Sequence, residues 1–157
     1  MHGHLGGRPP AVDLGNEKKL ADLLHAASQQ SLISSAHDLS AGGLGQALAE
    51  GVLRFGVGAR VWLREIMERD GVDAASALFS ESTGRVIVTV PREDDVKFRG
   101  LCEGRGYPVL RIGVSDAPGD GDDPALEVQD LFTVSLTELR GLSTATLPAA
   151  FGPTVVE

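Results

Sequence analysis

The segment HDLSAGG, residues 37–43, contains residue types that bind phosphate and divalent cations. Gly42 and Gly43 carry no Cβ, so their backbone amides could approach a phosphate group closely. Asp38 could bind Mg²⁺, which prefers oxygen ligands and shares them with phosphate, and Ser40 could donate to a phosphate oxygen. The simpler interpretation is that Asp38 and Ser40 cap the following helix while the glycines only turn the chain.

A second polar segment, SESTGR at residues 80–85, places the carboxylate of Glu81 among three hydroxyl groups and close to an arginine. Glu81 and Ser82 could contact a metal ion or a phosphate. The alternative is a polar turn that precedes a strand. Two such turns, each beside a predicted strand, could converge on one cleft, and the sequence alone does not show that they do.

Other reactive side chains form no recognisable pattern. Three histidines lack a second ligand at a zinc-like spacing and are expected in solvent: His2, His4 and His25. His37 is expected to make a structural hydrogen bond, and Cys102 to be a core thiol on the apolar side of a helix. The acidic residues at 120–123 lack the spacing of an EF-hand and predict a solvated loop. No GxxxxGK, GxSxG or HExxH motif is present.

Hydrophobic spacing predicts the elements that position the two polar segments. A helix is expected to begin near Asp13 or Asn16 and to run to about Gln30, followed by a short strand over 32–36. Apolar residues at helical spacing predict an amphipathic helix over 44–55. Residues 37–43 would then join a strand to a helix, an arrangement that directs free amides at an anion.

The rest of the chain also alternates between strands and helices. The predicted elements are a strand at 60–63, helices at 64–70 and 73–79, a central strand at 86–90, a helix ending near 103, strands at 107–114 and 126–132, and a helix from 137 that Pro148 interrupts. Seven aromatic residues, about one per element, are expected to be core anchors. Breakers in residues 1–13 predict a linker, which leaves 14–157 as a single lobe and a layered α/β sandwich as the architecture.

Composition limits the kinds of partner. The 157 residues include 14 Lys and Arg against 22 Asp and Glu, a net charge of −8 that argues against a nucleic-acid partner. No stretch approaches the roughly 20 apolar residues that span a bilayer, and the start lacks the apolar region of a signal peptide. The single cysteine excludes an internal disulfide. We expect a soluble protein of a reducing compartment.

The segments AHDLSAGGLGQALAE and LFSESTGRVIVTV resemble the C-terminal lobe of the small bacterial type of phosphoribosylformylglycinamidine synthase. This is the PurL family, within the aminoimidazole ribonucleotide synthetase superfamily. The resemblance runs from GGRPPAVDL near the start to LPAAFG near the end. The combination of residues 37–40 with 78–82 favours the purine-pathway synthase over other members of the superfamily. Such proteins often carry an acid at the position of Ala41, and this chain does not.

The resemblance implies an α+β fold, a layered α/β sandwich of the aminoimidazole ribonucleotide synthetase C-terminal-domain type that is partly ferredoxin-like. It also implies a cytoplasmic ligase of de novo purine biosynthesis. The complete enzyme would convert formylglycinamide ribonucleotide, ATP and ammonia into formylglycinamidine ribonucleotide, ADP and phosphate. Because the ATP-binding half is not in this sequence, the chain alone is expected to be inactive.

The resemblance further implies the site and the partners. Asp38 would correspond to a magnesium ligand and Glu81 to a substrate contact of the first of two pseudo-equivalent repeats. The cofactors would be ATP and Mg²⁺, and the implied cofactor contacts, with no catalytic residue, are Ser40, Gly42, Gly43, Glu81 and Ser82. The partners would be the N-terminal ATP-binding lobes, a glutaminase subunit that supplies ammonia and a small adaptor subunit.

Two other functions stay open from the residues alone. A free-standing module could bind a small phosphate ligand or an amino acid through the same glycine turn. The chain could also be a lobe of another ATP-dependent synthetase or kinase of the superfamily.

Overall fold

The structure, a computed structural model, describes residues 10–116 and 123–152, which fall into two compact units. Unit 1 comprises Met1–Leu44 and Phe79–Val109, and unit 2 comprises Gly45–Leu78 and Leu110–Glu157. One boundary falls inside helix α2 (Gly43–Phe55). Each unit therefore combines two separate parts of the sequence.

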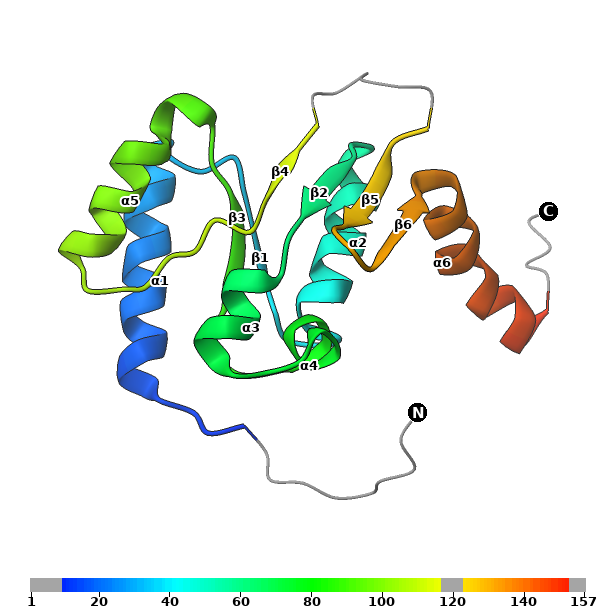
Figure 1. Cartoon of the computed structure of the whole chain (residues 1–157), viewed down its shortest axis with the longest axis horizontal. Coiled ribbons are helices and arrows are strands. Elements are labelled where there is room, and N and C mark those ends of the chain that lie inside the picture. Colours follow the sequence, from blue (N-terminus) through cyan, green and yellow to red (C-terminus); the bar gives the residue numbers. More distant parts are fainter. Residues whose placement is uncertain (1–9, 117–122, 153–157) are drawn as a thin grey trace. The chain divides into compact units, whose positions relative to one another are not determined.

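Unit 1 is built on two antiparallel strands, β1 (Ser35–Asp38) and β3 (Val86–Thr89). Helices α1 (Leu14–Gln29) and α5 (Asp95–Gly104) lie side by side (Figure 1), and a 3-10 turn, η1 (Arg92–Asp94), leads into α5. Apolar side chains from both helices and from the segment before β1 form the core of the unit: Leu23, Ala27, Leu32, Phe98 and Cys102. Cys102 is thus the core thiol that was predicted.

Helix α1 confirms the predicted start and explains an error in the strand that follows. The carboxylate of Asp13 accepts hydrogen bonds from the amides of Gly15 and Asn16, as an N-cap does. At the other end, Ser31 has a positive φ of 55°, and the Leu32 amide donates to the Ala27 carbonyl at 2.9 Å. Such a Schellman ending draws Leu32 into the helix terminus. The strand therefore begins at Ser35, three residues later than predicted.

Unit 2 contains a four-stranded sheet in the order β4-β2-β5-β6. Its strands are β2 (Ala59–Val61), β4 (Gly113–Ser115), β5 (Ala125–Val128) and β6 (Phe132–Ser135), and only β2 and β5 pair in parallel. The unit also holds most of α2 together with α3 (Arg64–Asp70), α4 (Ala74–Phe79) and α6 (Leu136–Phe151). The strand predicted at 60–63 is present as β2 but ends at Val61, because Leu63 already caps α3. The two short helices are confirmed, and Gly71 ends α3 with a φ of 64°.

Three predictions for the C-terminal half were wrong. The strand expected over 107–114 is limited to β4, because Pro108 has no amide to donate and the Tyr107 side chain bonds elsewhere. The strand expected over 126–132 is a hairpin of β5 and β6, turned at Asp130 with a φ of 63°. Helix α6 continues to Phe151 past position 148, since a proline removes one amide donor without excluding helical backbone angles on either side.

Two further expectations about the core were wrong. Three predicted aromatic anchors are 43% to 60% exposed, namely Phe55, Phe79 and Phe132, because aliphatic side chains fill most of the buried positions. Of the Phe side chains described, Phe98 is the one in the buried core. Strand β3, predicted to be central, pairs with β1 alone among the described residues.

The two sheets with their helices confirm the predicted mixed α/β class. None of the helices in residues 10–116 and 123–152 has both the length and the apolar character needed to cross a bilayer. His2, His4 and the centre of the 120–123 acidic segment lie outside the described residues.

Candidate functional site

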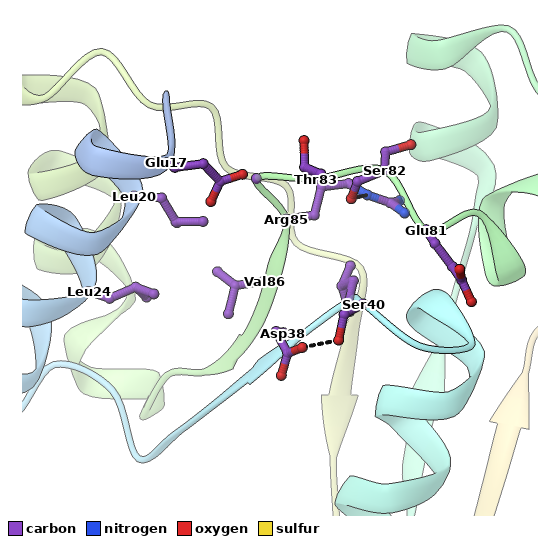
Figure 2. A pocket seen from close by; sticks show the side chains of 12 residues that line it. Glu17, Leu20, Leu24, Asp38, Ser40, Glu81, Ser82, Thr83, Arg85 and Val86 are labelled. Carbon is purple, nitrogen blue, oxygen red and sulfur yellow. Dashed lines mark hydrogen bonds between the residues drawn. The ribbon is translucent and has the colours of Figure 1, made fainter. Parts of the chain in front are cut away.

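The two polar segments meet in unit 1, as the hypothesis of one cleft required. The register of the antiparallel strands places Asp38, at the end of β1, opposite Val86, at the start of β3. Segment 37–43 continues from β1 at the same end of the strand pair at which segment 80–85 leads into β3. Both segments line a pocket of about 290 Å³ (Figure 2). The pocket has a polar side formed by these two segments. Its apolar side is formed by Leu20 and Leu24 of α1 with Val86.

A direct hydrogen bond joins the two segments. The Gly42 amide donates to Oε1 of Glu81 at 2.8 Å, across 39 residues of sequence. Gly42 and Gly43 have φ values of 74° and 62°, which glycine adopts without strain. The amide that was expected to meet a phosphate therefore meets a carboxylate of the same chain, just before the N-terminus of α2.

Asp38 and Ser40 bond to each other at the end of β1. The Ser40 hydroxyl donates to the Asp38 carboxylate, as Figure 2 shows. This hydrogen bond, followed by one from the Asp38 backbone and by the nearby His37, lowers the pKa of Asp38 below its usual range. His37 also makes the predicted structural contact, with Nδ1 2.7 Å from the Asp38 carbonyl oxygen. The simpler interpretation thus changes: the side chain that accepts an amide at the start of α2 is that of Glu81, while Ser40 accepts the Gly43 amide through its backbone carbonyl at 3.3 Å.

Segment 80–85 is itself held by hydrogen bonds to backbone carbonyls. The Tyr107 hydroxyl donates to the Gly84 carbonyl at 2.6 Å, and the Thr83 hydroxyl donates to the Ala11 carbonyl at 2.8 Å. Burial, with a smaller effect from Glu17, raises the pKa of Tyr107. The bond to Ala11 ties the predicted linker to the rim of the pocket.

Sequence reasoning missed several residues of this site. Glu17 of α1 lines the pocket, and no local motif marks it. Leu20 and Leu24 belong to an apolar helical stripe that predicted burial and gave no sign of a pocket. Tyr107 was predicted to lie in a strand, although its hydroxyl supports the turn at Gly84.

The lining of the pocket is rich in carboxylates, which are groups that attract a cation and repel a nucleotide phosphate. Mg²⁺ usually keeps several waters and uses one or two carboxylates plus phosphates, a role that the 71% exposed side chain of Asp38 can take. Within the described ranges, no group of three His, Cys, Asp or Glu side chains could hold a metal by itself. The lining residues offer three carboxylates and one guanidinium, that of Arg85, which bonds to Ser80 and Ser82. Unit 1 alone therefore does not fit the charge of a nucleotide triphosphate.

Comparison with known families identifies the kind of domain. The sequence model of the family described as "AIR synthase related protein, C-terminal domain" matches residues 1–122. The matched range contains both polar segments of the pocket.

Two curated relatives are similar over almost the whole chain. The phosphoribosylformylglycinamidine synthase subunit PurL of Leifsonia xyli subsp. xyli is 72% identical over 155 residues, which is 99% of this chain and 20% of that protein. The subunit of the same name from Renibacterium salmoninarum is 53% identical over 152 residues, 97% of this chain and 19% of that protein. The chain thus spans about one fifth of the length of the relatives it matches.

Solved structures agree on the fold. Thermotoga maritima PurL complexed with ATP has a TM-score of 0.63 and 22% identity, over 78% of this chain and 21% of that chain. The structure of PurLQS from the same organism has a TM-score of 0.65 and 22% identity, over 82% of this chain and 22% of that chain. At this level of identity the likeness is one of fold alone.

Proposed function

Because this chain belongs to the AIR synthase related protein C-terminal domain family, we propose that it is the C-terminal lobe of an ATP-dependent phosphoribosylformylglycinamidine synthase. The enzyme would convert formylglycinamide ribonucleotide, ATP and ammonia into formylglycinamidine ribonucleotide, ADP and phosphate in the cytoplasm. The 72% identity to a PurL subunit over 99% of the chain is the observation that carries this proposal.

The chain would contribute one lobe rather than a complete active site. It covers about one fifth of its relatives, and its pocket has a single guanidinium, that of Arg85, against three carboxylates, which is too little positive charge for a triphosphate. We propose that residues 14–157 form this lobe, that 1–13 connect it to N-terminal ATP-binding lobes, and that the isolated chain has no activity. The bond between Thr83 and Ala11 supports such a connection beside the pocket.

Within the complete enzyme, the pocket of unit 1 would face a phosphate-bearing ligand. Asp38 would bind Mg²⁺, and the chain's other ligand contacts would come from both polar segments: Ser40, Gly42, Gly43, Glu81 and Ser82. Ser40, Glu81 and Ser82 line one pocket with Asp38, and the Gly42 amide is bonded to Glu81, which supports this assignment. A phosphate that reaches the Gly42 amide has to displace the Glu81 carboxylate, so cations from other lobes are needed to favour the exchange.

The complete enzyme would also have protein partners. The Thermotoga maritima relative is described in a PurLQS assembly, which supports a glutaminase subunit that supplies ammonia and a small adaptor subunit.

Reconstitution tests the proposal directly. The N-terminal lobes are expressed separately and mixed with this chain, and ADP release that depends on formylglycinamide ribonucleotide and ammonia is followed. Turnover is expected in the mixture and in neither part alone. A folded complex without turnover would contradict the assigned reaction and favour another substrate.

A double substitution tests the site within that reconstituted enzyme. Asp38→Ala with Glu81→Ala should reduce the number of nucleotides bound per enzyme if the pocket of unit 1 binds one. Lys18→Ala is a suitable control, because Lys18 lies on an exposed part of α1 and pairs with Asp22. Unchanged nucleotide stoichiometry in the double variant would leave Asp38 and Glu81 with structural roles only.

A further inference from the structure

Arg85 makes an unusual set of contacts for a residue at the start of a strand. Its Nη2 atom donates to the Ser80 carbonyl and, at 3.1 Å, to the Ser80 hydroxyl. Its Nε atom lies 3.4 Å from the Ser82 carbonyl. One planar guanidinium therefore holds the backbone on both sides of Glu81, a fork geometry that lysine cannot reproduce.

The backbone of Arg85 is fixed next to both strands of unit 1. The Arg85 carbonyl accepts from the Leu39 amide at 3.2 Å, immediately after β1, and β3 begins at the next residue. Gly84, with a φ of 68°, is held through its carbonyl by Tyr107. The guanidinium thus acts from a fixed backbone position on residues 80–82.

The residue that these Arg85 hydrogen bonds affect most is Glu81, which lies between Ser80 and Ser82. Its long side chain is exposed and bonds to an amide that is distant in the sequence, so ordering it costs conformational entropy. With the Ser80 and Ser82 carbonyls held, the backbone part of that cost is already met. The carboxylate can then stay on Gly42.

We propose that Arg85 is a positioning residue that sets the 80–82 backbone so that Glu81 closes the glycine turn at Gly42. It acts through Glu81, by its hydrogen bonds to the Ser80 and Ser82 carbonyls. By fixing Glu81, Arg85 determines how easily the Gly42 amide is released to a competing anion. The inference deepens the proposed function, on which it rests only for the identity of that anion.

The test uses the complete 157-residue chain and the backbone amide of Gly42 as its probe. Arg85→Lys keeps the charge and removes the fork, and it should shift the Gly42 amide resonance and speed its hydrogen exchange by about tenfold or more, as expected for loss of a charged hydrogen bond. Arg99→Lys is the matched control, because Arg99 of unit 1 bonds to Asp95 within α5. That control should leave Gly42 unchanged.

A double-mutant cycle separates positioning from a general structural role. In a Glu81→Ala background the Gly42 contact is already lost, so adding Arg85→Lys should change the Gly42 amide no further. An equal effect of Arg85→Lys with and without Glu81 would overturn the proposal, as would an unchanged Gly42 amide in the single variant. If Arg85→Lys fails to fold, Ser80→Ala is the alternative, because it removes the hydroxyl that accepts from Arg85. It should shift the Gly42 amide resonance and its hydrogen exchange in the same direction by a smaller amount. An unchanged Gly42 amide in Ser80→Ala would then overturn the proposal.

These readouts involve no substrate. If the reconstituted synthase fails to turn over, the effect of Arg85 on the Gly42 amide can still be tested. If the double-mutant cycle shows no coupling of Arg85 to Glu81, the assigned reaction is unaffected. Failure of the two proposals can therefore be distinguished.

Discussion

Units 1 and 2 differ in what connects distant parts of the chain. In unit 1, side chains cross long stretches of sequence to reach the backbone, as Glu81 does to Gly42 and Tyr107 does to Gly84. In unit 2, most long-range bonds are those between the backbones of the sheet strands, with the bond from Trp62 Nε1 to the Arg111 carbonyl beside them. Gly113 allows β4 to come close to β2, since a Cβ on it would lie 2.5 Å from the Arg60 carbonyl oxygen. Polar side chains are therefore the positions to test in unit 1, whereas in unit 2 the position to test is Gly113, where β4 approaches β2.

The largest effect is expected in the core of unit 1. Phe98→Ala removes a side chain that is 4% exposed and should lower the free energy of unfolding by about 3–5 kcal/mol. Hydrogen exchange of the α1 and α5 amides measures the loss in unit 1, and fluorescence of the single tryptophan, Trp62, follows unit 2. Val96→Ala is the control, because Val96 lies on the same helix and is 81% exposed, so it should change stability by less than about 0.5 kcal/mol. Equal effects of the two substitutions would refute a separate core in unit 1.

The next effect tests the close approach of strands in unit 2. Gly113→Ala places a methyl group against the backbone of β2 and should cost about 1–3 kcal/mol, as overpacking does. Gly51→Ala in α2 is the matched control, since a Cβ there meets nothing within 4 Å and should raise helix stability by about 0.5–1 kcal/mol. Thermal unfolding of both variants gives the comparison. A neutral Gly113→Ala would mean that β2 and β4 separate easily.

The sequence predicted helices better than strands, for physical reasons. Helix α1 shows both an apolar period and an N-cap residue, Asp13, so its start was predictable. Its end depends on Ser31 in a left-handed conformation, which no residue type announces, and Leu32 was assigned to a strand as a result. The hairpin at Asp130 was missed similarly, because a non-glycine residue makes its turn.

The candidate site was predictable in its residue types and unpredictable in its contacts. Two polar segments beside strands suggested phosphate chemistry, and their convergence depends on the pairing of β1 with β3. That pairing is a tertiary feature set by packing against α1 and α5 rather than by either segment. The contact between Glu81 and Gly42, and the place of Glu17 in the pocket, follow from it.

A smaller effect should appear at the support of Gly84. Tyr107→Phe removes a hydrogen bond of 2.6 Å and should cost about 1 kcal/mol at neutral pH. The raised pKa of Tyr107 means that the folded state binds the phenolic proton more tightly than the unfolded state. This stabilisation is complete below the ordinary pKa of about 10 and is lost as the pH rises through the folded value.

The loss of stability at alkaline pH that comes from Tyr107 should be absent from the Tyr107→Phe variant. Tyr107 is the single tyrosine, so phenolate absorbance follows its titration directly, and denaturation between neutral and alkaline pH follows stability. Glu17→Gln is the informative companion, because Glu17 contributes to the raised pKa and its removal should lower that pKa while burial keeps it elevated. A Tyr107→Phe protein that shows the same alkaline loss as the original chain would assign the loss to another group.

The smallest effect concerns Asp38, at the solvent-exposed end of β1. Ser40→Ala removes the hydrogen bond that contributes most to the lowered pKa of Asp38, so that pKa should rise towards its ordinary value, as measured by carboxyl NMR titration. A lowered pKa stabilises the folded state above the ordinary pKa, and the contribution disappears as the pH falls through the folded value. Ser35→Ala is the control, because the Ser35 hydroxyl bonds to Thr89 on the same pair of strands. An unchanged Asp38 titration in Ser40→Ala would instead assign the shift to the backbone hydrogen bond or to His37.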